Sequence, residues 1–250
     1  MEKNKTKQIV KTYYGKIATK KNSGCCSGCG CVDATTSEQI AESIGYSNQE
    51  IKSASDANLG LGCGNPTGMG EIKKGDTVLD LGSGAGFDCF LAAKKVGESG
   101  LVIGVDMSEE MIERAKANAD KYGHKNVEFR LGDIEELPVE DNSIDIIISN
   151  CVINLAPDKS KVFSEARRVL KKGGKMYISD IVLLEPLSKE QRANEELLAG
   201  CVGGALLKND YINIIEKTGL KVKILSEDKD ISKRQYQGIP LESIKIEVQK

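Results

Sequence analysis

The stretch VLDLGSGAGFD, residues 78–88, decides how this sequence folds. A short apolar run ends at Leu81, and Gly82, Gly84 and Gly86 follow before a helical pattern begins. Glycine tolerates positive φ and carries no Cβ, so a turn of this kind lets the backbone approach a ligand closely. The stretch therefore predicts a strand, a ligand-binding loop and a helix in succession.

The same alternation of apolar runs and helical segments continues to about residue 185. The runs are TVLDL, LVIGVD, VEFRLGD, IDIIIS and KMYISDIVL, with helices expected at 87–96, 109–122 and 159–170. This pattern predicts an α/β, Rossmann-like fold with a mostly parallel, doubly wound sheet. Helices at 189–199 and 209–218, followed by the alternating segments LKVKILSE and ESIKIEVQ, predict an antiparallel hairpin at the sheet edge.

The segment before this alternation has a different composition. It contains the Cys- and Gly-rich stretches GCCSGCGC at 24–31 and GLGCGNPTGMG at 60–70. We interpret residues 1–74 as a Cys-rich N-terminal cap, 75–187 as the Rossmann-like, cofactor-binding core, and 188–250 as substrate-site helices and closing strands. A length of 250 residues fits one large domain with elaborations.

Charge and cysteine content narrow the functional class. With 35 basic and 37 acidic residues the net charge is −2, which disfavours nucleic-acid binding. The N-terminus has no apolar core of signal-peptide length, and we expect a cytoplasmic protein with no membrane partner. Eight cysteines are many for a reducing compartment and favour metal, redox or catalytic roles, although Cys89 fits an apolar helix pattern and is interpreted as core.

Acidic residues mark the ends of the first three strands. Asp106 ends LVIGVD, about twenty residues beyond the loop, where a carboxylate can accept both hydroxyls of an adenosine ribose. Asp133, in LGDIEELP, is expected near an adenine amino group. Asp80 precedes Gly82 by two residues, where it would repel a pyrophosphate and attract an ammonium group. This charge argues against a nicotinamide-dependent dehydrogenase, the main alternative for such a loop.

These motifs resemble those of class I S-adenosylmethionine (SAM) methyltransferases. The first motif corresponds to residues 80–86, and the later ones to Asp106 with Met107 and Asp133 with Ile134. Asn150, at the end of IDIIISN, is expected to face the methionine part of the cofactor. The resemblance implies SAM bound by Asp80, Gly82, Ser83, Gly84, Gly86, Asp106, Met107, Asp133, Ile134 and Asn150.

Three further cysteines lie in settings that a methyltransferase fold directs at its substrate. Cys63 belongs to NLGLGCGNP, Cys151 follows the fourth strand, and Cys201 begins CVGGA. The sequence resembles the arsenite methyltransferase family over most of its length. The matching segments are YYGKIA (13–18), ANLGLGCGNP (57–66), LDLGSGAGFDCFLA (79–92), GVDMSEEMIERA (104–115), SNCVINL (149–155) and CVGGA (201–205).

The resemblance implies that Cys63, Cys151 and Cys201 bind a trivalent arsenical as ligands and as the catalytic residues. Soft arsenic prefers thiolates, and three of them leave its lone pair free to attack the SAM methyl carbon. No general base is required, which agrees with a single histidine, His124, in an expected solvent-exposed turn. The family also implies an N-terminal cysteine for thiol-disulfide exchange and a thioredoxin- or glutathione-type reductant.

Several alternatives remain open from the sequence. The cluster Cys25, Cys26, Cys29 and Cys31 could supply the redox partner or capture arsenic, or it could hold zinc or an iron-sulfur cluster, although CC-x2-C-x-C is not a standard zinc spacing. The leading function is an arsenite SAM methyltransferase acting in detoxification. The others are a methyltransferase of a small organic molecule with structural cysteines, and a non-catalytic metalloid-binding protein. The chain ends at residue 250, without room for the extra C-terminal domain of longer family members.

Overall fold

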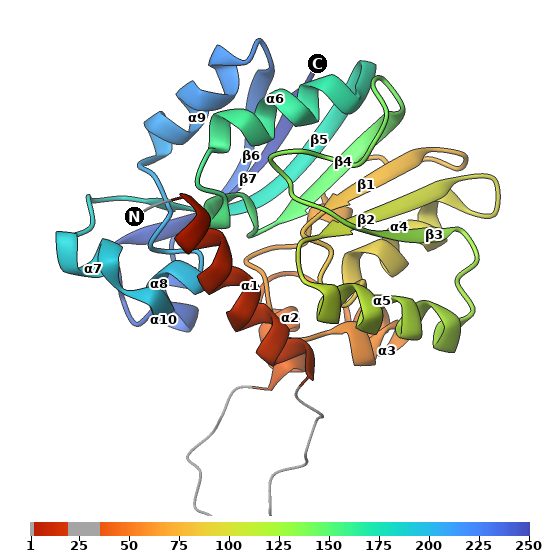
Figure 1. The fold of residues 1–250 in the computed structure, drawn as a ribbon, viewed down its shortest axis with the longest axis horizontal. Helices are drawn as coiled ribbons and strands as arrows, with labels where there is room; N and C mark the ends of the chain where they lie inside the picture. The colour runs from red at the N-terminus through yellow and green to blue at the C-terminus, as the bar shows by residue number, and fades with distance from the viewer. Residues whose placement is uncertain (1–2, 20–35) are drawn as a thin grey trace, which may run out of the picture.

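A seven-stranded sheet forms the centre of the computed structural model, which describes residues 3–19 and 36–250 (Figure 1). The strand order is β3-β2-β1-β4-β5-β7-β6. The strands are β1 (Thr77–Leu81), β2 (Leu101–Asp106), β3 (Val127–Leu131), β4 (Ile144–Asn150), β5 (Leu170–Leu183), β6 (Lys221–Asp228) and β7 (Leu241–Gln249). Neighbouring strands from β3 to β5 are parallel, and β7 pairs antiparallel with both β5 and β6. The predicted fold class and the antiparallel edge hairpin are confirmed.

Helices cover both faces of the sheet because its buried strands are apolar on both sides. On one face, Val78 packs in a cluster with residues of α4 (Phe87–Val96) and α5 (Glu109–Tyr122). On the other face, Leu79 shares a cluster with residues of α6 (Lys159–Val169) and α9 (Lys208–Lys217). Figure 1 shows the two helix layers on either side of the strands. This is the doubly wound arrangement that the sequence predicts.

Most predicted helices are observed close to their expected bounds, but the prediction of a single helix at 189–199 is wrong. The chain forms two short helices instead, α7 (Lys189–Ala193) and α8 (Glu195–Ala199). Asn194 separates them with an extended backbone, at φ −74° and ψ 119°. Its side-chain oxygen accepts a hydrogen bond from the Leu197 amide at 2.9 Å, so an N-cap replaces a helical turn.

Several helices that the sequence analysis did not predict lie outside the alternating pattern, and some of them cover the carboxyl edge of the sheet. They are α1 (Lys3–Thr19), α2 (Ser37–Ser43), α3 (Asn48–Ser53) and α10 (Ile231–Gln235), with short 3₁₀ turns at Ser55–Ala57, Pro66–Gly68 and Ile153–Leu155. Figure 1 shows α1 running across this edge. Cys25, Cys26, Cys29 and Cys31 lie outside the described residues. Within the described part of the chain, no helix has both the length and the apolar character needed to cross a membrane.

Candidate active site

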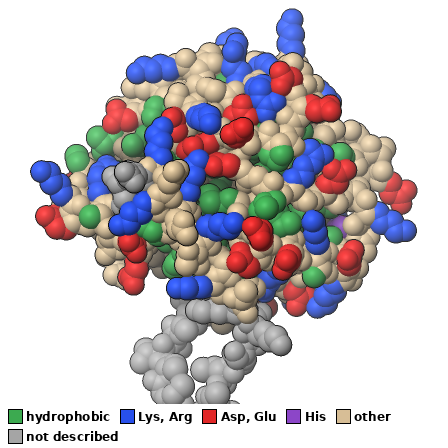
Figure 2. All heavy atoms as spheres, viewed as in Figure 1, with side chains coloured by type: hydrophobic (Ala, Val, Ile, Leu, Met, Phe, Trp, Pro, Cys, Tyr) green, Lys and Arg blue, Asp and Glu red, His purple; other side chains and the backbone are tan. Residues whose placement is uncertain are grey.

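A cavity of about 440 Å³ opens at the carboxyl ends of β1, β2 and β4. Its walls include Gly82 and Gly84 of the glycine loop, Asp106, and the two cysteines Cys151 and Cys201. Residues of α1 also line it. On the face shown in Figure 2, hydrophobic side chains line a hollow near the centre, with charged side chains around it. The cavity therefore joins the predicted cofactor loop to the predicted thiol site.

The glycine loop is tightly fitted on one side and open on the other. Gly82 has φ 68°, and a Cβ there would lie 2.3 Å from Val152, so only glycine fits. A Cβ at Gly84, in contrast, would meet no atom within 4 Å, because this position faces the cavity. Between them, the buried Ser83 hydroxyl has no hydrogen-bond partner among the described residues. The loop thus presents bare backbone and one unused hydroxyl toward a ligand.

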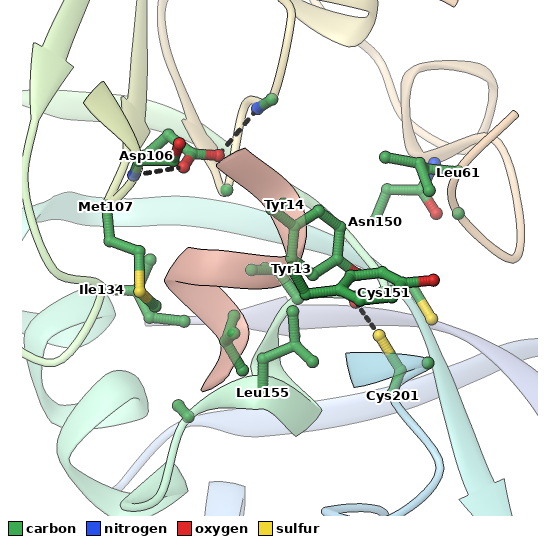
Figure 3. A pocket seen from close by; sticks show the side chains of 18 of the residues that line it. Tyr13, Tyr14, Leu61, Asp106, Met107, Ile134, Asn150, Cys151, Leu155 and Cys201 are labelled. Carbon is green, nitrogen blue, oxygen red and sulfur yellow. Dashed lines mark hydrogen bonds between the residues drawn. The ribbon is translucent and has the colours of Figure 1, made fainter. Parts of the chain in front are cut away.

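Asp106 is held in place by the backbone around it (Figure 3). Its Oδ2 accepts a hydrogen bond from the Gly84 amide at 2.9 Å, and its Oδ1 accepts one from Ser108 at 2.9 Å. Burial raises the pKa of this carboxyl, and the backbone amides oppose that effect. Met107 and Ile134 line the cavity beside Asp106 and form an apolar surface. This combination suits the ribose and the flat base of an adenosine.

Asp133 does not line the 440 Å³ cavity, whereas its neighbour Ile134 does. Its Oδ2 forms a 2.6 Å ion pair with Lys7 of α1, which also contacts Glu135 at 2.6 Å. Its Oδ1 accepts a hydrogen bond from the Glu135 amide at 2.8 Å. Asp133 therefore anchors α1 above the cofactor side of the cavity, a role that the sequence motif did not indicate.

Asp80 and Asp88 line a smaller cavity of about 80 Å³ that shares Gly82, Gly84 and Asn150 with the larger one. Burial raises the pKa of Asp80 well above its usual value, and the negative charge of Asp88 adds to this. Burial also raises the pKa of Asp88, to about 6. Two buried carboxyls with raised pKa values form a site that a cation would stabilise.

Asp88 and Tyr46 were not among the residues singled out from the sequence. The Tyr46 hydroxyl donates a hydrogen bond to Asp88 Oδ1 at 2.7 Å, and the Cys89 thiol lies 3.2 Å from Asp80 Oδ2. Cys89 is fully buried, as expected for a core residue, but its thiol also contacts a carboxylate. Asp88 is the last residue of the stretch VLDLGSGAGFD, and this place directly after the glycine loop could have marked it as a site residue.

Asn150 connects the cofactor side of the cavity to the segment that carries Cys63. Its side-chain oxygen accepts a hydrogen bond from the Cys63 amide at 3.0 Å, and its nitrogen donates to the Gly64 carbonyl at 2.8 Å. A Cβ at Gly64 would lie 2.3 Å from the Ser179 hydroxyl, so the segment packs directly on β5. The amide group of Asn150 thus fixes the cysteine segment in addition to lining both cavities.

Cys63, Cys151 and Cys201 are all buried, free thiols. They come from the loop before β1, the end of β4 and the segment after α8, and they meet through Cys151. The Cys201 sulfur lies 2.6 Å from the Cys151 carbonyl oxygen (Figure 3). Cys151 has φ 59° and Cys201 φ 67°, a region in which non-glycine residues are strained. Strain at two cysteines that face one cavity is typical of a functional site.

The three thiols have different acidities because of their contacts. Hydrogen bonds from Cys201 and then from Cys63 hold the pKa of Cys151 well below the usual thiol value, although burial opposes this. The hydrogen bond to Cys151 raises the pKa of Cys201, and burial raises that of Cys63. Cys151 is therefore the most readily deprotonated of the three thiols.

Two tyrosines that the sequence did not single out lie beside these thiols. The Tyr236 hydroxyl is 3.9 Å from the Cys151 sulfur. Tyr14 of α1 donates a hydrogen bond to the Ala199 carbonyl at 3.0 Å, and burial raises its pKa. Both residues line the large cavity. Tyr14 belongs to the YYGKIA stretch, but no sequence pattern distinguishes Tyr236.

Two other features from the sequence analysis are the single histidine and a possible metal site. His124 is half-buried and stacks on Phe90 with ring centroids 4.7 Å apart, so the expectation of a solvent-exposed side chain is wrong. Among residues 3–19 and 36–250, no group of three or more His, Cys, Asp or Glu side chains is arranged to hold a metal ion.

Comparisons with known proteins agree with this geometry. A family model described as "Methyltransferase domain" matches residues 72–219, more than half of the chain. Together with the fold, the glycine loop and the acidic strand ends, this match places the chain in the class of SAM-dependent methyltransferases.

Relatives identify a narrower group. An arsenite methyltransferase of Halobacterium salinarum is 44% identical over 90% of this chain and 60% of its own length, and the human one is 37% identical over 84% and 56%. A crystal structure described as an arsenic (III) S-adenosylmethionine methyltransferase of Chlamydomonas reinhardtii is 35% identical, with a TM-score of 0.63, over 87% of this chain and 74% of that one. The chain belongs to the arsenite methyltransferase family. It spans between 56% and 65% of the length of these curated arsenite methyltransferases and of one from Aquipseudomonas alcaligenes.

Proposed function

We propose that this protein methylates trivalent arsenic, with SAM as the methyl donor and Cys63, Cys151 and Cys201 as the ligands of the substrate. The observation that carries the proposal is a cavity with the buried, free thiols of Cys151 and Cys201 at one end and the glycine loop and Asp106 at the other. The third buried thiol, Cys63, does not line this cavity but contacts Cys151. Family membership supports the same reaction. The acidic and glycine positions would be without a purpose in a protein that only binds metalloids.

The residues at the cofactor end fit SAM by their chemistry. Asp106 would accept the ribose hydroxyls, and Met107 and Ile134 would cover the base. The buried carboxyls of Asp80 and Asp88 would balance the ammonium group of the methionine part, because a nearby cation favours their charged forms. When bound, SAM supplies a sulfonium methyl group that the lone pair of trivalent arsenic can take up.

The three cysteines would load arsenic by ligand exchange. Cys151 has the lowest thiol pKa of the three and would attack first, since the thiolate is the reactive form. At each exchange an As–O bond breaks and an As–S bond forms, and the displaced hydroxide leaves as water with a thiol proton. Since the thiols contact one another in pairs through Cys151, Cys63 and Cys201 must turn toward a common arsenic atom. Holding that atom in place would supply most of the catalysis.

After methyl uptake, arsenic is formally pentavalent and must be reduced before a second methyl can be added. A fourth thiolate attacks an arsenic-bound sulfur, a disulfide forms, and the electron pair of the As–S bond returns to arsenic. A thiol reductant of the thioredoxin or glutathione type would then reduce the disulfide. The fourth thiol would come from Cys25, Cys26, Cys29 or Cys31. Detoxification of arsenic inside the cell follows from this proposal.

The Cys151→Ser variant tests the ligand set. A serine hydroxyl has the shape of the thiol but is a poor ligand for soft arsenic. We expect arsenite methylation to fall by more than about 100-fold, because the arsenic is no longer held near the methyl donor. Products are measured by chromatography with mass detection, and SAM affinity, measured by calorimetry on the same variant, should be unchanged. Undiminished arsenic methylation would show that Cys151 is not a ligand that the reaction needs.

A further inference from the structure

The helix α10 brings polar side chains to the thiol end of the cavity that the proposed reaction does not yet use. Residues 234–236, at the end of α10 and directly after it, all line the 440 Å³ cavity. Tyr236 contacts the Cys151 sulfur at 3.9 Å, which places this segment beside the thiolate. Arg234 forms an ion pair with Asp228. Gln235, between them, also lines the cavity and carries a neutral amide.

The side-chain amide nitrogen of Gln235 is buried and has no hydrogen-bond partner among the residues that the structure describes. Leaving such a donor unpaired costs roughly 1–3 kcal/mol. Buried polar groups nearly always have a partner, so an exception that lines a cavity indicates that a ligand supplies the acceptor. An apolar side chain of this size would avoid the cost if the position served only for packing.

We propose that the Gln235 amide donates a hydrogen bond to a hydroxyl oxygen of the trivalent arsenical while it is transferred to the cysteines. This inference rests on the proposed function and names a residue that recognises the substrate. A neutral donor suits arsenous acid, As(OH)₃, which is uncharged near neutral pH. The hydrogen bond draws electron density toward the oxygen that leaves, so it assists cleavage of the As–O bond as the As–S bond forms. The thiol proton leaves with that oxygen as water, and arsenic stays trivalent.

The inference predicts a distinction between two forms of the substrate. Arsenous acid carries hydroxyl oxygens, whereas arsenic bound to three glutathione molecules carries only sulfur. In the second case an As–S bond to glutathione breaks, an As–S bond to cysteine forms, and the cysteine proton passes to the released glutathione. Gln235 has no arsenic-bound oxygen to contact in that exchange, so it should assist loading only from the free acid.

The experiment compares loading of the full-length wild-type protein with that of Gln235→Leu, without SAM. Loading is followed by the growth of near-ultraviolet As–S absorption after mixing with arsenite or with arsenic triglutathione. We expect loading from arsenite to slow about three- to tenfold in the variant, as for loss of one hydrogen bond, and loading from arsenic triglutathione to stay within twofold. Gln49→Leu, the same change at an exposed position of α3, should leave both rates unchanged.

The possible results separate the role of Gln235 from the proposed function. Equal slowing with both donors, or no slowing with either, overturns the role of Gln235. Wild-type protein that loads arsenic but never methylates it overturns the proposed function and leaves the loading comparison valid. SAM affinity and the unfolding temperature show whether Gln235→Leu is folded, and Gln235→Ala serves as the second variant if it is not.

Discussion

At the scale of single residues, the unusual feature is the backbone of two cysteines. Cys151 and Cys201 both adopt positive φ, which costs of order 1 kcal/mol for a residue with a side chain. Backbone hydrogen bonds hold both residues in place. The Cys151 amide donates to the Ser179 carbonyl of β5 at 2.8 Å, and the Cys201 amide donates to the Leu198 carbonyl at 3.2 Å. The surrounding fold therefore holds both sulfurs toward one cavity.

The raised pKa of Asp88 predicts a pH dependence of SAM binding. Because burial raises this pKa to about 6, the carboxyl is neutral below that pH and offers no charge to an ammonium group. We expect the SAM association constant, measured by calorimetry, to fall as the pH is lowered from 7 to 5, by up to about tenfold per unit below 6. In Asp88→Asn this fall should be much smaller. A flat profile in the wild-type protein would show that Asp88 does not face the ammonium group.

The same shift predicts the opposite trend for stability without ligand. The native state holds the Asp88 proton more tightly than the unfolded chain, whose pKa is near 3.8. The contribution of Asp88 to stability is therefore present below about pH 4 and is lost as the pH rises through 6. The ligand and stability profiles should thus change in opposite directions over this window.

Sequence reasoning located the site residues better than it described their contacts. The glycine loop and Asp106 follow from spacing alone, because strand ends of a parallel sheet converge at one edge. The positive φ of Cys151 could not be predicted, since that conformation usually belongs to glycine or asparagine. Asp133 was expected near an adenine amino group, but it does not line the 440 Å³ cavity, and its ion pair with Lys7 depends on a helix more than a hundred residues away in the chain.

At the scale of elements, α1 is the helix that closes the cavity, and its sequence gives little warning of this. It buries only Thr6, Val10, Gly15 and Ala18, which are small or weakly apolar. A helix over a ligand cavity does not need the wide apolar stripe of a helix on a core. The helices at Phe87–Val96 and Glu109–Tyr122, in contrast, pack on the sheet and were predicted with their observed bounds.

The ion pairs of α1 predict an effect on SAM release. Lys7→Met keeps the aliphatic chain but leaves Asp133 and the buried Glu135 side chain, which is 6% exposed, without their cation. A loss of about 1 kcal/mol in the closure of α1 corresponds to roughly fivefold faster SAM dissociation, measured by stopped-flow displacement. Lys5→Met, at an exposed position of the same helix, is the control. Equal dissociation rates in Lys7→Met and the wild-type protein would mean that α1 does not retain the cofactor.

At the scale of the whole molecule, the cofactor end of the cavity is built from elements spread along the chain. The glycine loop, Asp106 and the Asn150 contacts join β1, β2 and β4 to the loop before β1. The order of strands along the sheet, with β7 between β5 and β6, could not be read from hydrophobic patterns, because these specify faces and not neighbours.

This arrangement predicts that SAM stabilises the whole fold. At a concentration of about 100 times its dissociation constant, a ligand adds about 2.7 kcal/mol, which raises the unfolding temperature by roughly 5–10 °C for a chain of this size. Asp106→Ala should lose most of this rise in a calorimetric scan, because its carboxylate would no longer meet the ribose. A full rise in the variant would indicate that the ribose lies elsewhere.

The most direct test of the account is turnover by the purified protein with arsenite, a thiol reductant and SAM that carries a deuterated methyl group. The account predicts methylated arsenicals whose mass shows the deuterated methyl on arsenic, and their loss in Cys151→Ser. If SAM binds normally but no methylated arsenical forms, then the assignment of arsenic as the substrate is contradicted.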